Sequence, residues 1–137
     1  MSFQTLHSVN FQDCDPAGIV FYPRYFEMLD QTVEDWLRQT GAWDYPANGA
    51  AFETGPQIAK VEVDFQRPSR LGDQLVFELQ LQSVDERRVR LSVLVRSGSE
   101  QRLRAFLNLG WISNEKCADG TRLPSLLRRT LTTMIDV

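Results

Sequence analysis

Residues 13–30 of this 137-residue chain combine an acidic turn with the start of a helix, an arrangement that suits attack on a carbonyl group. Asp15 precedes Pro16, and the proline ring disfavours the helical conformation at the aspartate. Gly18 follows closely and lets the backbone pass near a ligand. The turn is therefore expected to form a cradle beside the Asp15 carboxyl group.

The helix predicted after this turn begins at Pro23, which fits a first-turn position because its missing N–H is no loss there. The first N–H groups of a helix have no partner inside it. We therefore expect the N–H groups around Phe21 and Tyr22 to be unpaired and to point back over the turn. Such donors bind developing negative charge.

Hydrophobic periodicity indicates which elements hold this turn. Apolar residues at helical spacing predict one long amphipathic helix from Pro23 to about Thr40, with Gly41 as its stop. Alternation of apolar and polar residues predicts five strands, and a final apolar stripe predicts a short helix. The predicted strands are 3–11, 59–66, 75–81, 89–95 and 103–111, and the short helix spans about 126–134.

Each later strand has a single apolar face, so one antiparallel sheet can wrap around the apolar stripe of the long helix. In the second strand this face is formed by Ala59, Val61, Val63 and Phe65. The length suits one domain over 1–137. We expect an α+β domain with about five antiparallel strands. Residues 42–56 are expected to form a packed loop, and unpaired sheet edges favour a homo-oligomer.

Composition narrows the range of functions. The net charge is −3 and the basic residues are scattered, which disfavours a nucleic-acid binder. No apolar run approaches membrane-spanning length, and we expect a cytoplasmic protein without membrane insertion. Cys14 and Cys117 belong to no CxxC or Cys/His cluster, so neither a disulfide nor a metal site is expected.

The motif Asp13-Cys14-Asp15-Pro16-Ala17-Gly18-Ile19-Val20, followed by Tyr22-Pro23, Tyr25 and Leu29-Asp30, resembles the hotdog-fold acyl-CoA thioesterases of the 4-hydroxybenzoyl-CoA thioesterase family. The remaining strands are similar in order and spacing rather than in identity. The resemblance implies a hotdog fold, a sheet around one central helix. It also implies hydrolysis of an acyl-CoA thioester without a metal or organic cofactor.

The resemblance assigns roles to two residues of the motif. Asp15 matches the catalytic carboxylate, which acts either as nucleophile through a mixed anhydride or as general base on water. Tyr22 matches the position whose backbone N–H polarises the thioester carbonyl. Active sites of the family lie between subunits, which implies a dimer or a homotetramer here.

Substrate-binding residues are expected in three places. Gly18 lines the turn, and Asp30 borders the apolar stripe of the helix, where it meets either the acyl group or a partner chain. Arg87 and Arg88 in a hairpin turn, with Arg122 as a second candidate, are expected to contact coenzyme A phosphates.

Substrate choice stays open because the helix start departs from the family pattern. The departures are Phe21, Arg24, Phe26 and Met28. Hydroxybenzoyl, benzoyl and short-chain acyl groups are therefore all retained as candidates.

Several residues near the motif have simpler explanations. Asp13 is expected to cap the turn through backbone N–H groups. Cys14 would need a nearby cation or base to act as a nucleophile, and the only histidine, His7, is predicted to lie in a strand away from the helix start. The absence of a nearby histidine disfavours a hotdog hydratase. A non-catalytic acyl-CoA-binding module is the main alternative to the thioesterase.

Overall fold

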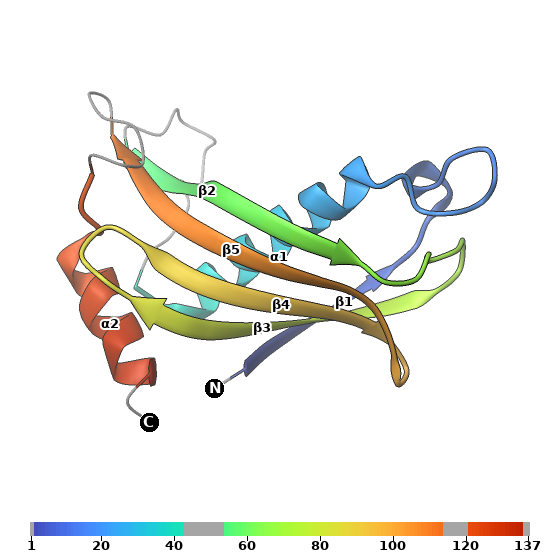
Figure 1. Cartoon of the computed structure of the whole chain (residues 1–137). Helices are drawn as coiled ribbons and strands as arrows, with labels where there is room; N and C mark the ends of the chain where they lie inside the picture. Colours follow the sequence, from blue (N-terminus) through green and yellow to red (C-terminus); the bar gives the residue numbers. More distant parts are fainter. Residues whose placement is uncertain (1, 43–53, 114–120, 136–137) are drawn as a thin grey trace.

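The computed structural model describes residues 2–42, 54–113 and 121–135. Its elements, in chain order, are β1 (Ser2–Ser8), the short 3-10 helix η1 (Phe11–Asp13), α1 (Pro23–Thr40), β2 (Thr54–Phe65), β3 (Gln74–Val84), β4 (Val89–Ser97), β5 (Glu100–Ser113) and α2 (Ser125–Ile135). The strands form one five-stranded antiparallel sheet, and α1 lies along one face of it (Figure 1). The predicted hotdog fold of class α+β is confirmed.

Helix α1 has the bounds that its sequence predicts. Pro23 occupies the first turn, and Gly41 ends the helix in a left-handed conformation with φ of 72°. Trp36 and Leu37 are buried beneath the sheet, 4% and 0% exposed. The inner face of the sheet supplies the rest of the core through the alternating apolar residues of β3, β4 and β5, which are Leu75, Phe77, Leu79, Val89, Leu91, Val93, Val95, Leu103, Ala105, Leu107 and Leu109.

The strand order is β1-β3-β4-β5-β2, so β2 and β3 are neighbours in sequence but not in the sheet. The chain leaves β2, an edge strand, at Phe65 and crosses toward the opposite edge of the sheet before β3 begins at Gln74. Strands β1 and β2 form the two edges as a result. The arrangement leaves β2 with a neighbour only in β5, which explains why its apolar residues Val61 and Val63 are half-buried rather than fully buried.

Two local predictions were wrong, and both errors have a geometric cause. The register of β2 against β5 shifts between Ile58 and Lys60, and this bulge turns Ala59 to the exposed side while Ile58 faces inward. The first strand ends at Ser8 rather than at residue 11, because the chain turns into η1. Phe11 is consequently 83% exposed instead of lying on the apolar face of the strand.

The predicted packed loop over 42–56 lies mostly outside the described residues, and Gly55 and Pro56 belong to β2 instead. Cys117 also lies outside the described residues. Helix α2 packs near β3 and buries Leu127 and Leu131. None of the helices in the described part of the chain is long and apolar enough to cross a membrane.

A half-buried arginine, Arg102, joins β5 to the segment that follows β2. Arg102 Nη1 donates to Asp73 Oδ2 at 2.7 Å and to Ser69 Oγ at 3.1 Å. The backbone of this segment in turn holds the acidic turn, because the Val20 N–H donates to the Ser69 carbonyl oxygen at 2.9 Å. Arg102 therefore holds in place the segment, containing Ser69 and Asp73, that binds the backbone of the acidic turn.

This ion pair predicts acid sensitivity. The hydrogen bond from Arg102, with a second bond from the Arg70 N–H, lowers the pKa of Asp73 below its usual value. A carboxyl group with a depressed folded pKa stabilises the protein above its unfolded pKa, near 4, and loses this contribution as pH falls through the folded pKa. Asp73→Asn should lower the free energy of unfolding at pH 7 by about 1 kcal/mol and flatten its decline below about pH 4. Urea titrations at several pH values measure this.

Asp64→Asn, an exposed change in β2, is the matched control. An Asp73→Asn protein whose unfolding free energy falls with acid as steeply as that of the Asp64→Asn protein would contradict the role given to the pair.

Candidate active site

The acidic turn is a narrow loop closed by backbone hydrogen bonds. Cys14 and Val20 form an antiparallel bridge, and the Asp15 N–H donates to the Ile19 carbonyl oxygen at 2.9 Å. The Gly18 N–H donates to the Asp15 carbonyl oxygen at 2.9 Å. Gly18 has φ of +79°, a conformation that side chains with a Cβ rarely adopt. A glycine is therefore required here by the turn itself.

The Asp15 side chain is partly exposed and folds over its own turn. Its Oδ1 atom accepts hydrogen bonds from the Ala17 N–H at 2.9 Å and the Ile19 N–H at 3.3 Å. The second oxygen, Oδ2, has no hydrogen-bond partner among the described residues. One oxygen therefore orients the carboxyl group, and the other is unpaired within the described part of the chain.

The start of α1 leaves one of the two expected N–H donors free. The Phe21 N–H donates to the Asp13 carbonyl oxygen at 2.9 Å, so the expectation that it is unpaired was wrong. The cause is the loop closure, which brings the backbone of Phe21 opposite Asp13. The Tyr22 N–H has no partner within the described part of the chain. A single free donor thus stands at the positive end of the helix.

A histidine does lie near this helix start, contrary to the prediction. His7 Nε2 is 3.4 Å from Asp13 Oδ2, and the same Oδ2 accepts the Asn10 N–H at 2.9 Å. The bond from Asn10 shows that Asp13 caps the short helix η1, which precedes the acidic turn. Sequence reasoning missed the histidine because the turn folds back onto β1, a contact that no local pattern encodes.

The Cys14 thiol is unsuited to nucleophilic attack. Partial desolvation, followed by the charges of Asp13 and Asp15, raises the pKa of this thiol above its ordinary value. A nucleophilic cysteine needs the opposite shift, because the thiolate is the reactive form. The shift therefore disfavours Cys14 as a nucleophile, in agreement with its sequence context.

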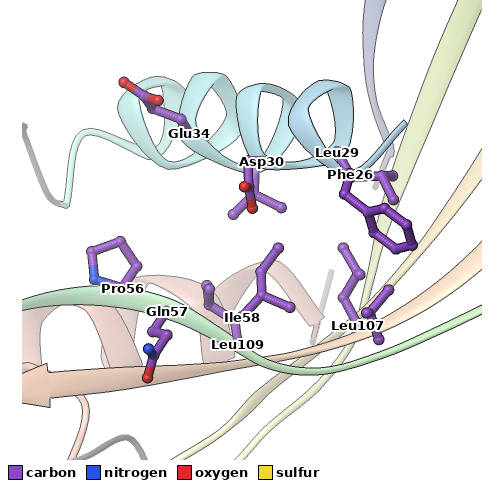
Figure 2. A pocket seen from close by; sticks show the side chains of 11 residues that line it. Phe26, Leu29, Asp30, Glu34, Pro56, Gln57, Ile58, Leu107 and Leu109 are labelled. Carbon is purple, nitrogen blue, oxygen red and sulfur yellow. The ribbon is translucent and has the colours of Figure 1, made fainter. Parts of the chain in front are cut away.

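A cavity of about 480 Å³ opens between α1 and the strands β2 and β5. Figure 2 shows Asp30 pointing from α1 toward Ile58 of β2, with Phe26 at one end of the cavity. Apolar side chains dominate the lining, and Asp30, Glu34 and Gln57 are its polar members. Phe26 and Ile58 were not among the predicted site residues, since only the packing of α1 against β2 brings them together.

The pKa of the Asp30 carboxyl group, which lines this cavity, is shifted. Partial burial raises the pKa of Asp30 above its usual value, and the nearby carboxylates of Glu34 and Glu27 raise it further. Its protonated form is therefore favoured relative to a free aspartate.

The residue that carries the free donor precedes two cavity-lining residues of α1 at helical spacing. Tyr22, Phe26 and Asp30 are spaced four residues apart, which aligns them along the helix. The Tyr22 ring also contacts the Phe65 ring at the end of β2, with centroids 6.4 Å apart. Neither Tyr22 nor Asp15 lines the cavity itself. The cavity lining thus includes Phe26, one helical turn after Tyr22 in the sequence, and Asp30, two turns after it.

The predicted phosphate-binding arginines lie at the other end of the sheet (Figure 1). Arg87 and Arg88 occupy the turn between β3 and β4, and their N–H groups donate to Asp85 Oδ1 at 2.9 and 2.8 Å. The acidic turn adjoins the opposite end of β3, where the Val9 N–H donates to the Asp73 carbonyl oxygen. With 11 residues in β3, the two ends are roughly 30 Å apart.

Arg122 joins the same end of the sheet as the other two arginines. The next residue, Leu123, donates its N–H to the Glu86 carbonyl oxygen at 2.9 Å, which ties this segment to the turn between β3 and β4. Arg122 is exposed and lines a shallow groove with Arg128 and Arg129 of α2. The structure thus gathers the candidate arginines but separates them from Asp15 and Tyr22 of the same chain.

Comparison with known proteins agrees with this architecture. The family model of the thioesterase-like superfamily matches residues 9–127. A 1,4-dihydroxy-2-naphthoyl-CoA hydrolase of Acaryochloris marina is 29% identical over 96 residues, 69% of each chain. Another, from Nostoc punctiforme, is 32% identical over 83 residues, which are 58% of this chain and only about half of that protein, 53%.

Among solved structures, the 4-hydroxybenzoyl-CoA thioesterase of Pseudomonas sp. strain CBS-3 superposes with a TM-score of 0.79 at 22% identity. The superposition covers 94% of this chain and 98% of that one, and it shows the same fold. The family model covers most of the chain, including the acidic turn, α1 and the strands β2 to β5. The chain therefore belongs to the thioesterase-like superfamily.

Proposed function

We propose that this protein is an acyl-CoA thioester hydrolase that releases a free acid and coenzyme A, with Asp15 and the Tyr22 N–H as its catalytic groups. The thioester carbonyl oxygen accepts a hydrogen bond from the Tyr22 N–H, which stabilises the negative charge that develops on that oxygen. Asp15 either attacks the carbonyl carbon, giving a mixed anhydride that water then hydrolyses, or takes a proton from an attacking water molecule.

One observation carries this proposal: a free N–H at the start of α1 stands beside a turn that orients a carboxylate with one unoccupied oxygen. The Tyr22 N–H has no partner among the described residues, and Asp15 Oδ2 has none either. An acid and an oxyanion donor are the two elements that acyl transfer from a thioester requires. Within the described part of the chain, Asp15 Oδ1 holds the turn, while Asp15 Oδ2 and the Tyr22 N–H make no structural hydrogen bond.

The cavity is suited to hold an aromatic or short acyl group, the part of the substrate that is released from coenzyme A. A thioester held at the Tyr22 N–H would extend its acyl group along α1, past Phe26 and toward Asp30. Asp30 lies eight residues beyond Tyr22, about 12 Å along the helix axis. The relatives named above act on hydroxylated aromatic acyl-CoA, and Asp30 is suited to contact a polar group at the far end of such a ring.

The phosphates of coenzyme A would be bound by arginines of a second copy of the chain. Arg87, Arg88 and Arg122 are roughly 30 Å along the sheet from Asp15 in one chain. We therefore infer a homo-oligomer, a dimer or a homotetramer, in which the arginine end of one subunit approaches the acidic turn of another. Residues 1–137 act as one thioesterase domain in this assembly, and the cytoplasm, where acyl-CoA is available, is its proposed location.

A thiol-release assay over benzoyl-CoA, 4-hydroxybenzoyl-CoA, 1,4-dihydroxy-2-naphthoyl-CoA and short-chain acyl-CoA tests reaction and substrate together. We expect turnover on at least one hydroxylated aromatic substrate. Binding of acyl-CoA without release of free thiol on any substrate would instead indicate the non-catalytic acyl-CoA-binding module.

Replacement of both Arg87 and Arg88 by Ala is expected to raise the KM for acyl-CoA about tenfold or more. The reason is the loss of two charge-assisted phosphate contacts. The KM for a truncated acyl-pantetheine thioester, which lacks the nucleotide, should stay unchanged. Steady-state kinetics on both substrates make the comparison. An equal rise in both KM values would remove the arginines from nucleotide binding.

A further inference from the structure

We propose that His7 and Asp13 form a positioning pair that holds the start of α1, and with it the Tyr22 N–H, in the geometry that the reaction needs. This inference rests on the proposed function for its kinetic consequence, while its structural basis is independent. His7 Nε2 and Asp13 Oδ2 lie 3.4 Å apart, within the range of an ion pair. The Asp13 side chain is 11% exposed and that of His7 is 35% exposed, so the contact is partly buried.

Asp13 connects three segments through two of its groups. Its Oδ2 atom receives the Asn10 N–H at 2.9 Å and faces His7 of β1. Its carbonyl oxygen receives the Phe21 N–H at 2.9 Å. Because Phe21 directly precedes Tyr22, the position of Asp13 decides where the free donor points. A displacement of Asp13 would therefore move the Tyr22 N–H relative to Asp15.

His7 anchors this connection to the rigid part of the fold. It lies near the end of β1, paired with Leu75 of β3. Its ring meets the buried Phe77 ring edge to face, with centroids 6.4 Å apart. The imidazole is thus restrained by the sheet on one side and contacts the Asp13 carboxylate on the other. A shorter side chain at this position would leave Asp13 without its contact to the sheet.

The pair acts on the rate of the chemical step rather than on substrate binding. Neither His7 nor Asp13 lines the cavity that contains Asp30. A change in their contact shifts the oxyanion donor, whose interaction is strongest in the transition state. A variant that lacks the contact should therefore have a lower kcat at nearly constant KM. The hydrogen bond from the Phe21 N–H to the Asp13 carbonyl oxygen should be weakened in the same variant.

The test compares His7→Ala, His7→Gln and the control Gln4→Ala. Gln at position 7 keeps a donor at a similar reach, whereas Gln4→Ala removes another side-chain contact of β1, its 3.2 Å bond to Glu78, away from the turn. His7→Ala should lower kcat about tenfold with KM within about twofold, and should raise the exchange rate of the Phe21 amide hydrogen about tenfold. His7→Gln should recover most of both, and Gln4→Ala should change neither.

Equal effects of His7→Ala and Gln4→Ala would overturn the inference, because they would reflect a general weakening of β1. Faster Phe21 exchange with an unchanged kcat would also overturn it, since the pair would then be structural alone. If the wild-type protein hydrolyses no acyl-CoA, the proposed function fails, and amide exchange at Phe21 and Tyr22, measured by NMR, still decides whether the pair holds the helix start.

Discussion

Replacing Asp15 by Asn is expected to lower turnover of acyl-CoA by roughly a thousandfold while leaving the fold and substrate binding intact. The amide keeps an oxygen that accepts the Ala17 and Ile19 N–H bonds, so the turn retains its shape. It loses the carboxylate oxygen that attacks the thioester or activates water. Steady-state kinetics measure the loss, and calorimetric titration of acyl-CoA measures retained binding.

Asp64→Asn makes the same chemical change at an exposed position of β2 and should leave turnover unchanged. Near-normal turnover of the Asp15→Asn protein would refute the catalytic assignment. A loss of binding or of thermal stability in that protein would point instead to a structural role of Asp15 in its turn.

Leu37→Ala is expected to lower the free energy of unfolding by about 3 kcal/mol, within a usual range of about 2 to 5 kcal/mol. Leu37 is 0% exposed and lies in α1 beneath the inner face of the sheet. Its truncation removes apolar contacts and leaves a cavity at the centre of the fold, where the strands cannot collapse around it. Urea unfolding followed by far-UV circular dichroism measures the change.

Gln39→Ala, two residues further along α1 and exposed, serves as the control and should change stability by less than about 0.5 kcal/mol. A Leu37→Ala protein as stable as this control would show that α1 is not the centre of the core.

Helix α1 was predictable to the residue because its signals are local. Pro23 restricts the backbone at the start, Gly41 supplies the left-handed stop, and the apolar stripe repeats with the helical period between them. The hairpin turns were predictable for the same reason, since Gly98 with φ of 58° suits a tight turn.

The sheet was predictable only in part. Alternation identifies the strands of β3, β4 and β5, whose inner residues are buried as expected. It does not identify partners, so the position of β2 beside β5 came from the structure. It also assumes an unbroken period of two, which the bulge between Ile58 and Lys60 interrupts, reversing the facing of Ala59.

The candidate site was also predictable only in part. Asp15 and the Tyr22 N–H follow from the motif, because a turn and a helix start are formed by neighbouring residues. The pairing of the Phe21 N–H and the approach of His7 to Asp13 do not, because they depend on how the turn folds against β1.

The amino-acid sequence by itself determined the long helix and the glycine that closes the acidic turn. It also determined that the Asp15 carboxyl group and the Tyr22 N–H lie at the two ends of that turn. Only the tertiary structure decided that a cavity between α1 and β2 contains Asp30, that His7 contacts Asp13, and that the arginines stand at the far end of β3. The physical reason is the distance along the sequence over which each interaction acts. Backbone sterics and helical periodicity act between neighbours, whereas a cavity or a contact between strands exists only after distant segments have packed against one another.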